Sequence, residues 1–186
     1  MYSASDLKKG LKVEIEGQPY VITDFNFVKP GKGQAIYTCK MKNLINGSTL
    51  TRQYRDNAKL EKPELEEKTL QYSYQEGENL VFLDQNFEQL TIPSSVLGDS
   101  KFFLVADSTV EVLFHNGKPI EVTLPTFVEK EIVHTEPGAR GDTATNVLKP
   151  ATIEGGYEIQ VPLFVDQGDI VRIDTRTGTY VDRARK

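Results

Sequence analysis

The amino-acid sequence predicts an all-β protein made of three consecutive small β-barrels. Apolar residues alternate with polar ones at period two, as in Leu11-Lys12-Val13-Glu14-Ile15, whereas a helix would repeat them every three or four positions. Many short strands separated by regular turns are typical of small barrels or sandwiches. The turn signals are dipeptides that contain glycine: Glu16-Gly17, Asn46-Gly47, Glu76-Gly77, Asn116-Gly117 and Thr177-Gly178.

Two changes in composition divide the chain into segments 1–64, 65–127 and 128–186. The first follows the charged, proline-containing run Lys59 to Glu64, and the second lies at Leu124-Pro125-Thr126-Phe127. Each segment has about 60 residues, a length that can fold alone. Three such barrels in a row predict an elongated body. One short helix is expected in residues 94–105, capped by Ser94 or Ser95 and interrupted by Gly98.

Composition limits the class of protein. Hydrophobic residues make up 38% of the chain and charged residues 26%, which is typical of a soluble globular protein. No segment has the apolar length of a membrane helix, and the N-terminus does not have the pattern of a signal peptide, so we expect a cytoplasmic protein. One cysteine and two histidines argue against a disulfide and against a zinc site. We expect no metal and no dissociable cofactor.

Charge is distributed unevenly along the chain. The net charge is −5, yet segment 1–64 holds eleven Lys and Arg against seven Asp and Glu. Segment 65–127 holds three against ten, and segment 128–186 holds eight against ten. Contact with phosphates should therefore begin at the N-terminal end, although chance variation over a solvated surface would give the same gradient.

The sequence lacks the motifs of the common enzyme classes. It has no nucleophile elbow, and Gly31-Lys32-Gly33 lacks both the earlier glycine and the following Ser or Thr of a phosphate-binding loop. His115 and His134 are interpreted as strand-end residues, and Asp166 and Asp169 as turn residues. We therefore expect no catalytic residue. A hydrolase or transferase remains an alternative that no group of residues supports.

One predicted hairpin presents a lysine. Strands are expected at residues 20–27 and 36–44, with Lys29-Pro30-Gly31-Lys32-Gly33-Gln34 between them. Pro30-Gly31 favours a type II turn with positive φ at the glycine, and Gly33 gives the backbone similar freedom. The pattern predicts that Lys32 projects from the tip. An ordinary surface lysine in a glycine-rich turn would have the same local sequence.

The next hairpin predicts a basic strip. A turn centred on Asn46-Gly47 would pair residue 39 with 54 and residue 40 with 53. Cys39, Met41 and Tyr54 would then face the core. The residues that would face outward are Thr38, Lys40, Lys42 and Arg55. Such a strip suits a nucleic-acid backbone, but a solvated strand face has the same pattern.

Several long motifs in order resemble the bacterial elongation factor P family. They are Phe27 to Ala35; Glu136 to Ala144; Lys149 to Gly156; Val161-Pro162-Leu163-Phe164-Val165 with Gly168-Asp169; and Asp174 to Arg183. The resemblance covers the whole chain. Thr126, where the family often has asparagine before Phe-Val, is a departure without functional weight.

The resemblance implies a fold and a function. The first barrel would be SH3-like (KOW-related) and the other two OB-like, in an L shape that mimics tRNA. Such a factor binds the ribosome, through ribosomal RNA and proteins, between the peptidyl-tRNA and exit sites, and it relieves stalling at consecutive prolines. We expect it to act as a monomer and not to bind membranes.

The resemblance also implies roles for particular residues. Lys32 would reach the CCA end of the P-site peptidyl-tRNA, supported by its hairpin neighbours and by the strip Lys40, Lys42 and Arg55 facing tRNA. Residues 141–143 would lie near the messenger-RNA codon of the exit site. Tyr180 and Arg183 would lie close to the small subunit. The residues of the exit-site loop are Gly141, Asp142 and Thr143.

Lys32 would also be the target of a lysine-modifying enzyme. A lysine excludes the arginine-linked glycosylation found in part of the family. It leaves open a β-lysyl-type extension, an amino-alcohol extension, or no modification. Two alternative functions remain: an elongation factor P-like paralogue, and a general single-stranded RNA-binding OB protein. The net acidic OB-like segments and the lack of dense aromatic–basic alternation count against the second.

Overall fold

The structure is a computed structural model that describes residues 1–137 and 147–185. Strands dominate the described residues, so the prediction of an all-β protein is confirmed. Contacts within the chain define two compact units, Met1–Glu67 with Leu113–Glu121, and Lys68–Val112 with Val122–Lys186. The segment boundaries at residues 64 and 127 stay a prediction.

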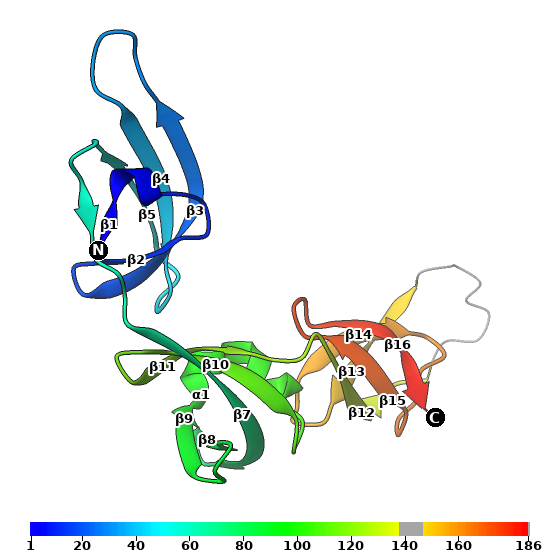
Figure 1. The fold of residues 1–186 in the computed structure, drawn as a ribbon. Coiled ribbons are helices and arrows are strands. Elements are labelled where there is room, and N and C mark those ends of the chain that lie inside the picture. The colour runs from blue at the N-terminus through cyan, green and yellow to red at the C-terminus, as the bar shows by residue number, and fades with distance from the viewer. Residues whose placement is uncertain (138–146, 186) are drawn as a thin grey trace. The chain divides into compact units, whose positions relative to one another are not determined.

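The first unit is built on one curved four-stranded sheet in the order β2-β3-β4-β5 (Figure 1). A short ladder of β1 and β6 accompanies it, and a 3-10 turn at Ala4–Asp6 follows β1. The strands are β1 Tyr2–Ser3, β2 Lys12–Ile15, β3 Gln18–Val28, β4 Ile36–Asn43, β5 Thr49–Tyr54 and β6 Lys59–Leu60.

The core of this unit includes Val13, Ile22, Cys39 and Met41, none of them more than 1% exposed. Cys39 is thus a core residue, as its alternation with Met41 predicted. Burial raises the pKa of its thiol, because desolvation disfavours the thiolate. Because Ile22, Cys39 and Met41 are part of this core, β3 and β4 are anchored by packing.

The predicted register between β4 and β5 is wrong by two residues. Cys39 lies opposite Arg52, and Tyr54 lies opposite Tyr37. The connection is a loop over residues 44–48, closed by the Asn43 carboxamide oxygen, which accepts hydrogen bonds from the backbone N–H of Ile45 (2.7 Å) and Asn46 (3.1 Å). A slip of two residues leaves the paired side chains on their predicted faces, because side chains alternate at period two.

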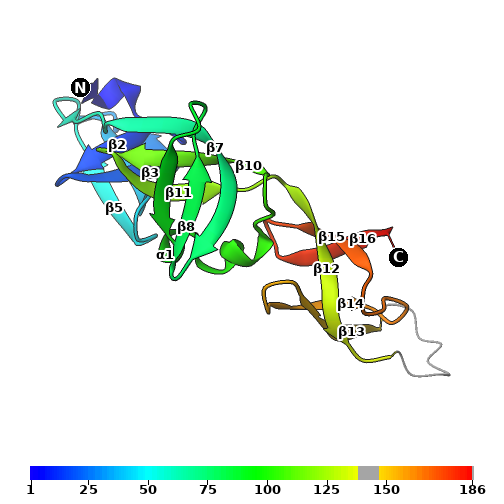
Figure 2. The ribbon, with the colours of Figure 1, turned by 90° about the horizontal axis from the view of Figure 1, so that it is seen from below.

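A five-stranded sheet in the order β11-β10-β7-β8-β9 follows along the chain (Figure 2). Its strands are β7 Leu65–Glu76, β8 Asn79–Leu83, β9 Gln89–Pro93, β10 Thr109–His115 and β11 Lys118–Thr123. The expected short helix is present as α1 Ser94–Leu97 and a 3-10 helix, η2, Gly98–Phe103. Gly98 separates them at φ +59°, but Pro93 and not a serine occupies the N-cap, without a side-chain cap.

The C-terminal strands form a second five-stranded sheet, β14-β13-β12-β15-β16. Its strands are β12 Phe127–Thr135, β13 Leu148–Ile153, β14 Glu158–Pro162, β15 Ile170–Asp174 and β16 Thr179–Arg185. The outer strands β14 and β16 also contact each other, so the sheet curls toward a barrel. Within the described ranges no helix is long and apolar enough to cross a membrane.

Phe103 at the end of η2 belongs to the core of the C-terminal barrel. It is 3% exposed and packs with Val128, Ile132 and Val171. The Tyr157 ring meets it edge-on, with ring centroids 5.3 Å apart. The second unit is therefore joined internally by an apolar side chain, and not by the backbone alone.

Candidate functional site

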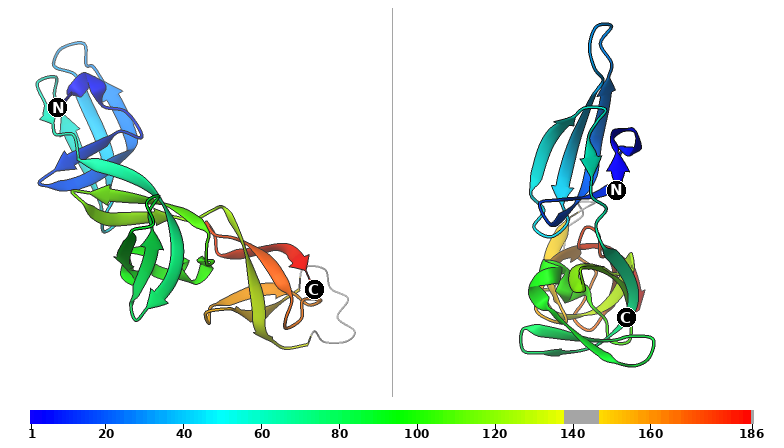
Figure 3. Two further views of the ribbon diagram at one scale, coloured as in Figure 1. Left: turned by 60° about the horizontal axis from the view of Figure 1, so that its bottom comes forward. Right: turned by 60° about the vertical axis from the view of Figure 1, so that its left-hand side comes forward.

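The candidate site is the loop Lys29–Ala35 that joins β3 to β4. The two strands pair from Tyr20 opposite Asn43 to Val28 opposite Ile36. Core burial in β3 ends at Ile22, so the distal part of the hairpin extends past the core of the sheet. Figures 1 and 3 show this hairpin as the most protruding part of the first unit.

Lys32 lies in the exposed part of this loop. Residues 29–34 are all exposed, and Ala35 alone is buried. Among residues 1–137 and 147–185, no hydrogen bond or ion pair engages Lys29 or Lys32. The ammonium group of Lys32 is thus free to meet an anionic partner or a modifying enzyme, which is the geometry that the sequence predicted.

The predicted type II turn at Pro30-Gly31 is wrong. Gly31 does not adopt a positive φ, whereas Gly33 has φ +135°. The chain bends over residues 31–33, because a loop that begins at Lys29 is long enough to reverse without a four-residue turn. The glycine requirement therefore falls on the residue after Lys32, since L side chains rarely adopt this φ.

Aromatic side chains line the stem beneath the loop, a feature that sequence reasoning missed. The Phe27 and Tyr37 rings lie 4.9 Å apart and the Phe25 and Tyr37 rings 6.3 Å apart. The Tyr37 hydroxyl donates a hydrogen bond to Asp56 (3.0 Å), and this bond raises the pKa of Tyr37. The alternation of Phe25 and Phe27 was the available signal. These contacts stiffen the strands that carry the loop.

The predicted basic strip is present only in part. Lys40 and Lys42 are exposed on β4, opposite Thr51 and Thr49. Arg55 is exposed but follows the last residue of β5, so it lies beyond the paired ladder. The strip on the strands themselves thus consists of two lysines, and its role in binding tRNA stays a prediction.

Two C-terminal residues named by the resemblance lie on β16. Tyr180 packs against the barrel core, and burial raises its pKa. Arg183 forms an ion pair with Asp169 (3.5 Å) and lies over the Phe164 ring at 4.9 Å. Arg183 is thus held by contacts within the barrel. The Phe164 ring that it covers is still 57% exposed. Gly141, Asp142 and Thr143 lie outside the described residues.

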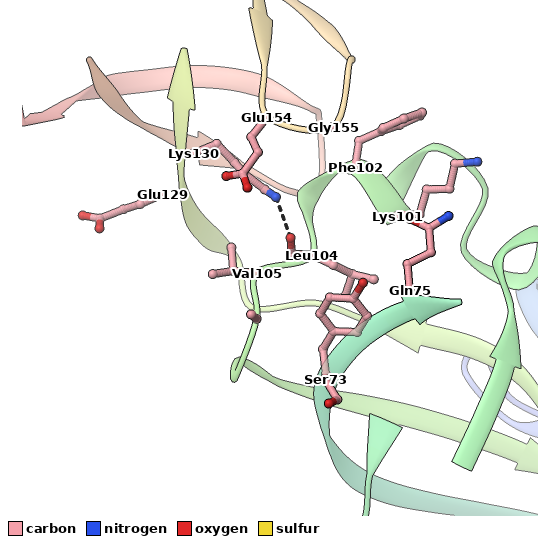
Figure 4. Close-up of a pocket in the computed structure, with 12 residues that line it drawn as sticks. Ser73, Gln75, Lys101, Phe102, Leu104, Val105, Glu129, Lys130, Glu154 and Gly155 are labelled. Carbon is pink, nitrogen blue, oxygen red and sulfur yellow. Dashed lines mark hydrogen bonds between the residues drawn. The ribbon is translucent and has the colours of Figure 1, made fainter. Parts of the chain in front are cut away.

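A cavity of about 540 Å³ lies in the second unit (Figure 4). Tyr72, Phe102 and Glu154 line it, and across its floor the Lys130 ammonium donates a hydrogen bond to the Leu104 carbonyl (2.6 Å). Burial lowers the pKa of Lys130, with Glu154 opposing that shift. Lys130 therefore links β12 to the segment after η2, and this hydrogen bond engages its ammonium group.

The described residues contain no group of three or more His, Cys, Asp or Glu placed to hold a metal ion. His115 is buried, with Nε2 3.0 Å from a Glu14 carboxylate oxygen, and Asp166 and Asp169 form a turn in which the Asp169 N–H bonds the Asp166 carbonyl (3.1 Å). The fold and the site therefore define a class: a modular protein of small β-barrels that presents an unpaired lysine on a hairpin.

Comparison with known proteins places this class in a family. Three family models match consecutive parts of the chain: the Elongation factor P KOW-like domain at residues 3–60, the Elongation factor P OB domain at 65–122, and Elongation factor P, C-terminal, at 128–183. The chain belongs to the elongation factor P family, whose members are translation factors.

Relatives agree along the whole length. The chain is 52% identical to Elongation factor P of Desulfotalea psychrophila and 51% identical to that of Desulforapulum autotrophicum, over all of both chains in each case. A solved structure, Eukaryotic translation initiation factor 5A from Methanococcus jannaschii, is 24% identical with a TM-score of 0.56, covering 66% of this chain and 91% of that one. That likeness supports the fold: an SH3-like barrel followed by OB barrels.

Proposed function

We propose that the chain binds the ribosome between the peptidyl-tRNA and exit sites and promotes peptide-bond formation at consecutive prolines. It acts by holding the CCA end of the peptidyl-tRNA, and it is not an enzyme. The observation that carries this proposal is Lys32, which is exposed on a stiffened hairpin and has no partner among the described residues. Membership of a translation-factor family supports the ribosome as the partner.

Positioning is sufficient for this role. Proline is a secondary amine with a fixed φ, so prolines at the growing end restrict how the reacting groups align. Holding one reactant in a productive orientation lowers the effective barrier by several kcal/mol without a reacting side chain. The ammonium group of Lys32 donates charge-assisted hydrogen bonds to phosphate oxygens, and Lys40 and Lys42 supply further positive charge.

Lys32 is also the proposed acceptor of a covalent extension. Its exposed loop gives a lysine-modifying enzyme access to the amine, and a β-lysyl-type or amino-alcohol extension would lengthen its reach toward the CCA end. Fragmentation mass spectrometry of the peptide spanning Lys32, from the native host, identifies the group or shows an unmodified lysine.

Substitution of Lys32 tests the proposal. We expect Lys32→Ala to keep the fold, because no residue that the structure describes pairs with this side chain, and to abolish rescue of polyproline-containing reporters in cells that lack the native protein. Lys12→Ala is the control, an exposed lysine on β2 outside the hairpin loop, and should retain most of the rescue. Full rescue by Lys32→Ala would disprove the mechanism. Tight, sequence-tolerant binding to RNA alone would instead favour the single-stranded RNA-binding alternative.

A further inference from the structure

Phe87 is an apolar side chain that the fold does not use. It lies in the loop between β8 and β9 and is 77% exposed, more than any other large apolar side chain in the described parts of the chain. A single exposed apolar residue is ordinary. Phe87 differs in three respects: its backbone conformation, the hydrogen bonds that close its loop, and the hollow beside its ring.

The backbone of Phe87 has φ +62°. This left-handed conformation costs an L residue about 1 kcal/mol or more, and hairpin loops of this kind favour glycine there. Phe87 therefore pays a conformational cost without gaining burial. Strain that packing does not offset is typical of positions kept for function.

The loop also holds Phe87 in place. One Asp84 carboxylate oxygen accepts hydrogen bonds from the N–H groups of Asn86 (2.8 Å) and Glu88 (2.9 Å). The Phe87 N–H bonds the Asp84 carbonyl at 3.0 Å. A ring on a fixed loop loses little conformational entropy on binding, as suits an anchor residue.

A hollow of about 270 Å³ lies beside the ring. Its walls include Leu70, Leu83, Thr69 and Thr109 together with Phe87 itself. An aromatic face next to a partly apolar hollow accepts an aliphatic side chain or the stem of an arginine, whose guanidinium stacks on the ring.

The negative charge around Phe87 favours a positively charged partner. Residues 68–112 hold two lysines and no arginine against seven Asp and Glu. Glu88 follows Phe87 directly, and Glu111 accepts a hydrogen bond from Thr69 (2.8 Å), a residue that lines the hollow. Nucleic-acid phosphates would be repelled here, whereas a positively charged protein surface would be attracted.

We propose that Phe87 and its hollow form a docking site for a Lys- and Arg-rich surface of a ribosomal protein. The partner inserts one aliphatic or arginine side chain beside the Phe87 ring, and its charges face Glu88 and Glu111. This inference rests on the proposed function, because it assigns a second contact on the same ribosome. It is separate from Lys32, which reaches RNA.

Affinity and crosslinking test the site. Phe87→Ala in the full chain should weaken equilibrium binding to ribosomes that carry peptidyl-tRNA by about fivefold or more, as for an interface anchor. Tyr74→Ala is the matched control, since Tyr74 is an exposed aromatic on β7 (45%); it should bind within about twofold of wild type. Phe87→Ala should leave the melting temperature unchanged, and Phe87→Gly should not lower it. A benzophenone amino acid at position 87 should crosslink to a basic ribosomal protein.

The outcomes separate this site from the function on which it rests. Unchanged affinity of Phe87→Ala, or crosslinking of position 87 to RNA, would overturn the docking site while the loss of rescue in Lys32→Ala still stood. Full rescue by Lys32→Ala together with weakened binding of Phe87→Ala would overturn the positioning mechanism and keep the docking site. A wild-type chain that does not bind ribosomes would overturn both.

Discussion

At the scale of single residues, the hairpin loop depends on one glycine and one lysine. Lys32 keeps its charge available because neither the loop nor the stem offers it a partner. Gly33 gives the loop its bend through a φ of +135°. Nothing lies within 4 Å of a Cβ built on Gly33 or on Gly31, so backbone conformation and not space distinguishes the two positions.

This difference yields a prediction. Gly33→Ala should shift the loop out of its bend, because the alanine Cβ disfavours that φ by about 1–3 kcal/mol. We expect reduced polyproline rescue with a melting temperature close to wild type, since the loop is outside the core. Gly31→Ala is the control and should rescue normally. If both variants rescued equally, the bend at Gly33 would have no part in placing Lys32.

At the scale of elements, the short helical segment α1–η2 joins the strands of the second unit. Phe102 and Phe103 end the segment. Phe102 stays partly exposed, whereas Phe103 is buried. Phe102 stacks on Tyr157 at 5.2 Å while half-buried, and Phe103 enters the C-terminal core. A Cβ on Gly178 would lie 3.2 Å from the Phe103 ring, so the turn before β16 also requires a small residue.

Phe103→Ala should therefore destabilise the C-terminal barrel by about 3–5 kcal/mol, because it leaves a cavity in a closed core. Urea unfolding together with hydrogen exchange over β12 to β16 would measure the loss. Phe102→Ala removes a ring of the same size from a partly exposed position and should cost clearly less. Equal effects would show that Phe103 acts through the contact with Tyr157 that it shares with Phe102, and not through core burial.

At the scale of the whole molecule, basic and acidic residues concentrate in different segments of the chain. The lysines concentrate in the first barrel, whereas residues 68–112 are acidic. A protein that contacted RNA over its full length would not be expected to carry this acidic region. The distribution supports the proposal that nucleic acid is contacted through the first barrel.

Salt dependence tests this division. Replacing Lys40 and Lys42 together by glutamine should weaken ribosome binding and reduce the slope of log affinity against log salt by roughly one unit per lost phosphate contact. Lys118→Gln, on β11, is a control for net charge and should leave the slope unchanged. An unchanged slope in the double variant would show that Lys40 and Lys42 do not face phosphates.

Local sequence was sufficient for several features of the fold and site. Alternation placed Cys39 and Met41 in the core, and it placed Lys40 and Lys42 outside, even though the predicted register was wrong by two residues. Glycine dipeptides marked the ends of strands, and Gly98 marked the break between α1 and η2. The hairpin and the exposed Lys32 followed from the same kind of signal, because turns and period-two patterns are properties of neighbouring residues.

The sequence by itself determined the all-β class, the faces of the strands and the position of Lys32 in a loop. Only the tertiary structure decided that Gly33 rather than Gly31 takes the positive φ, that Tyr37 joins Phe27 beneath the loop, and that Arg183 pairs with Asp169. It also decided that Phe103 enters the C-terminal core while Phe87 stays exposed. For Tyr37, Arg183 and Phe103 the physical reason is that these outcomes depend on contacts between residues apart in the chain, which local propensity does not encode. The φ values at Gly31 and Gly33 depend instead on how the whole loop closes between β3 and β4, which a two-residue turn signal does not encode.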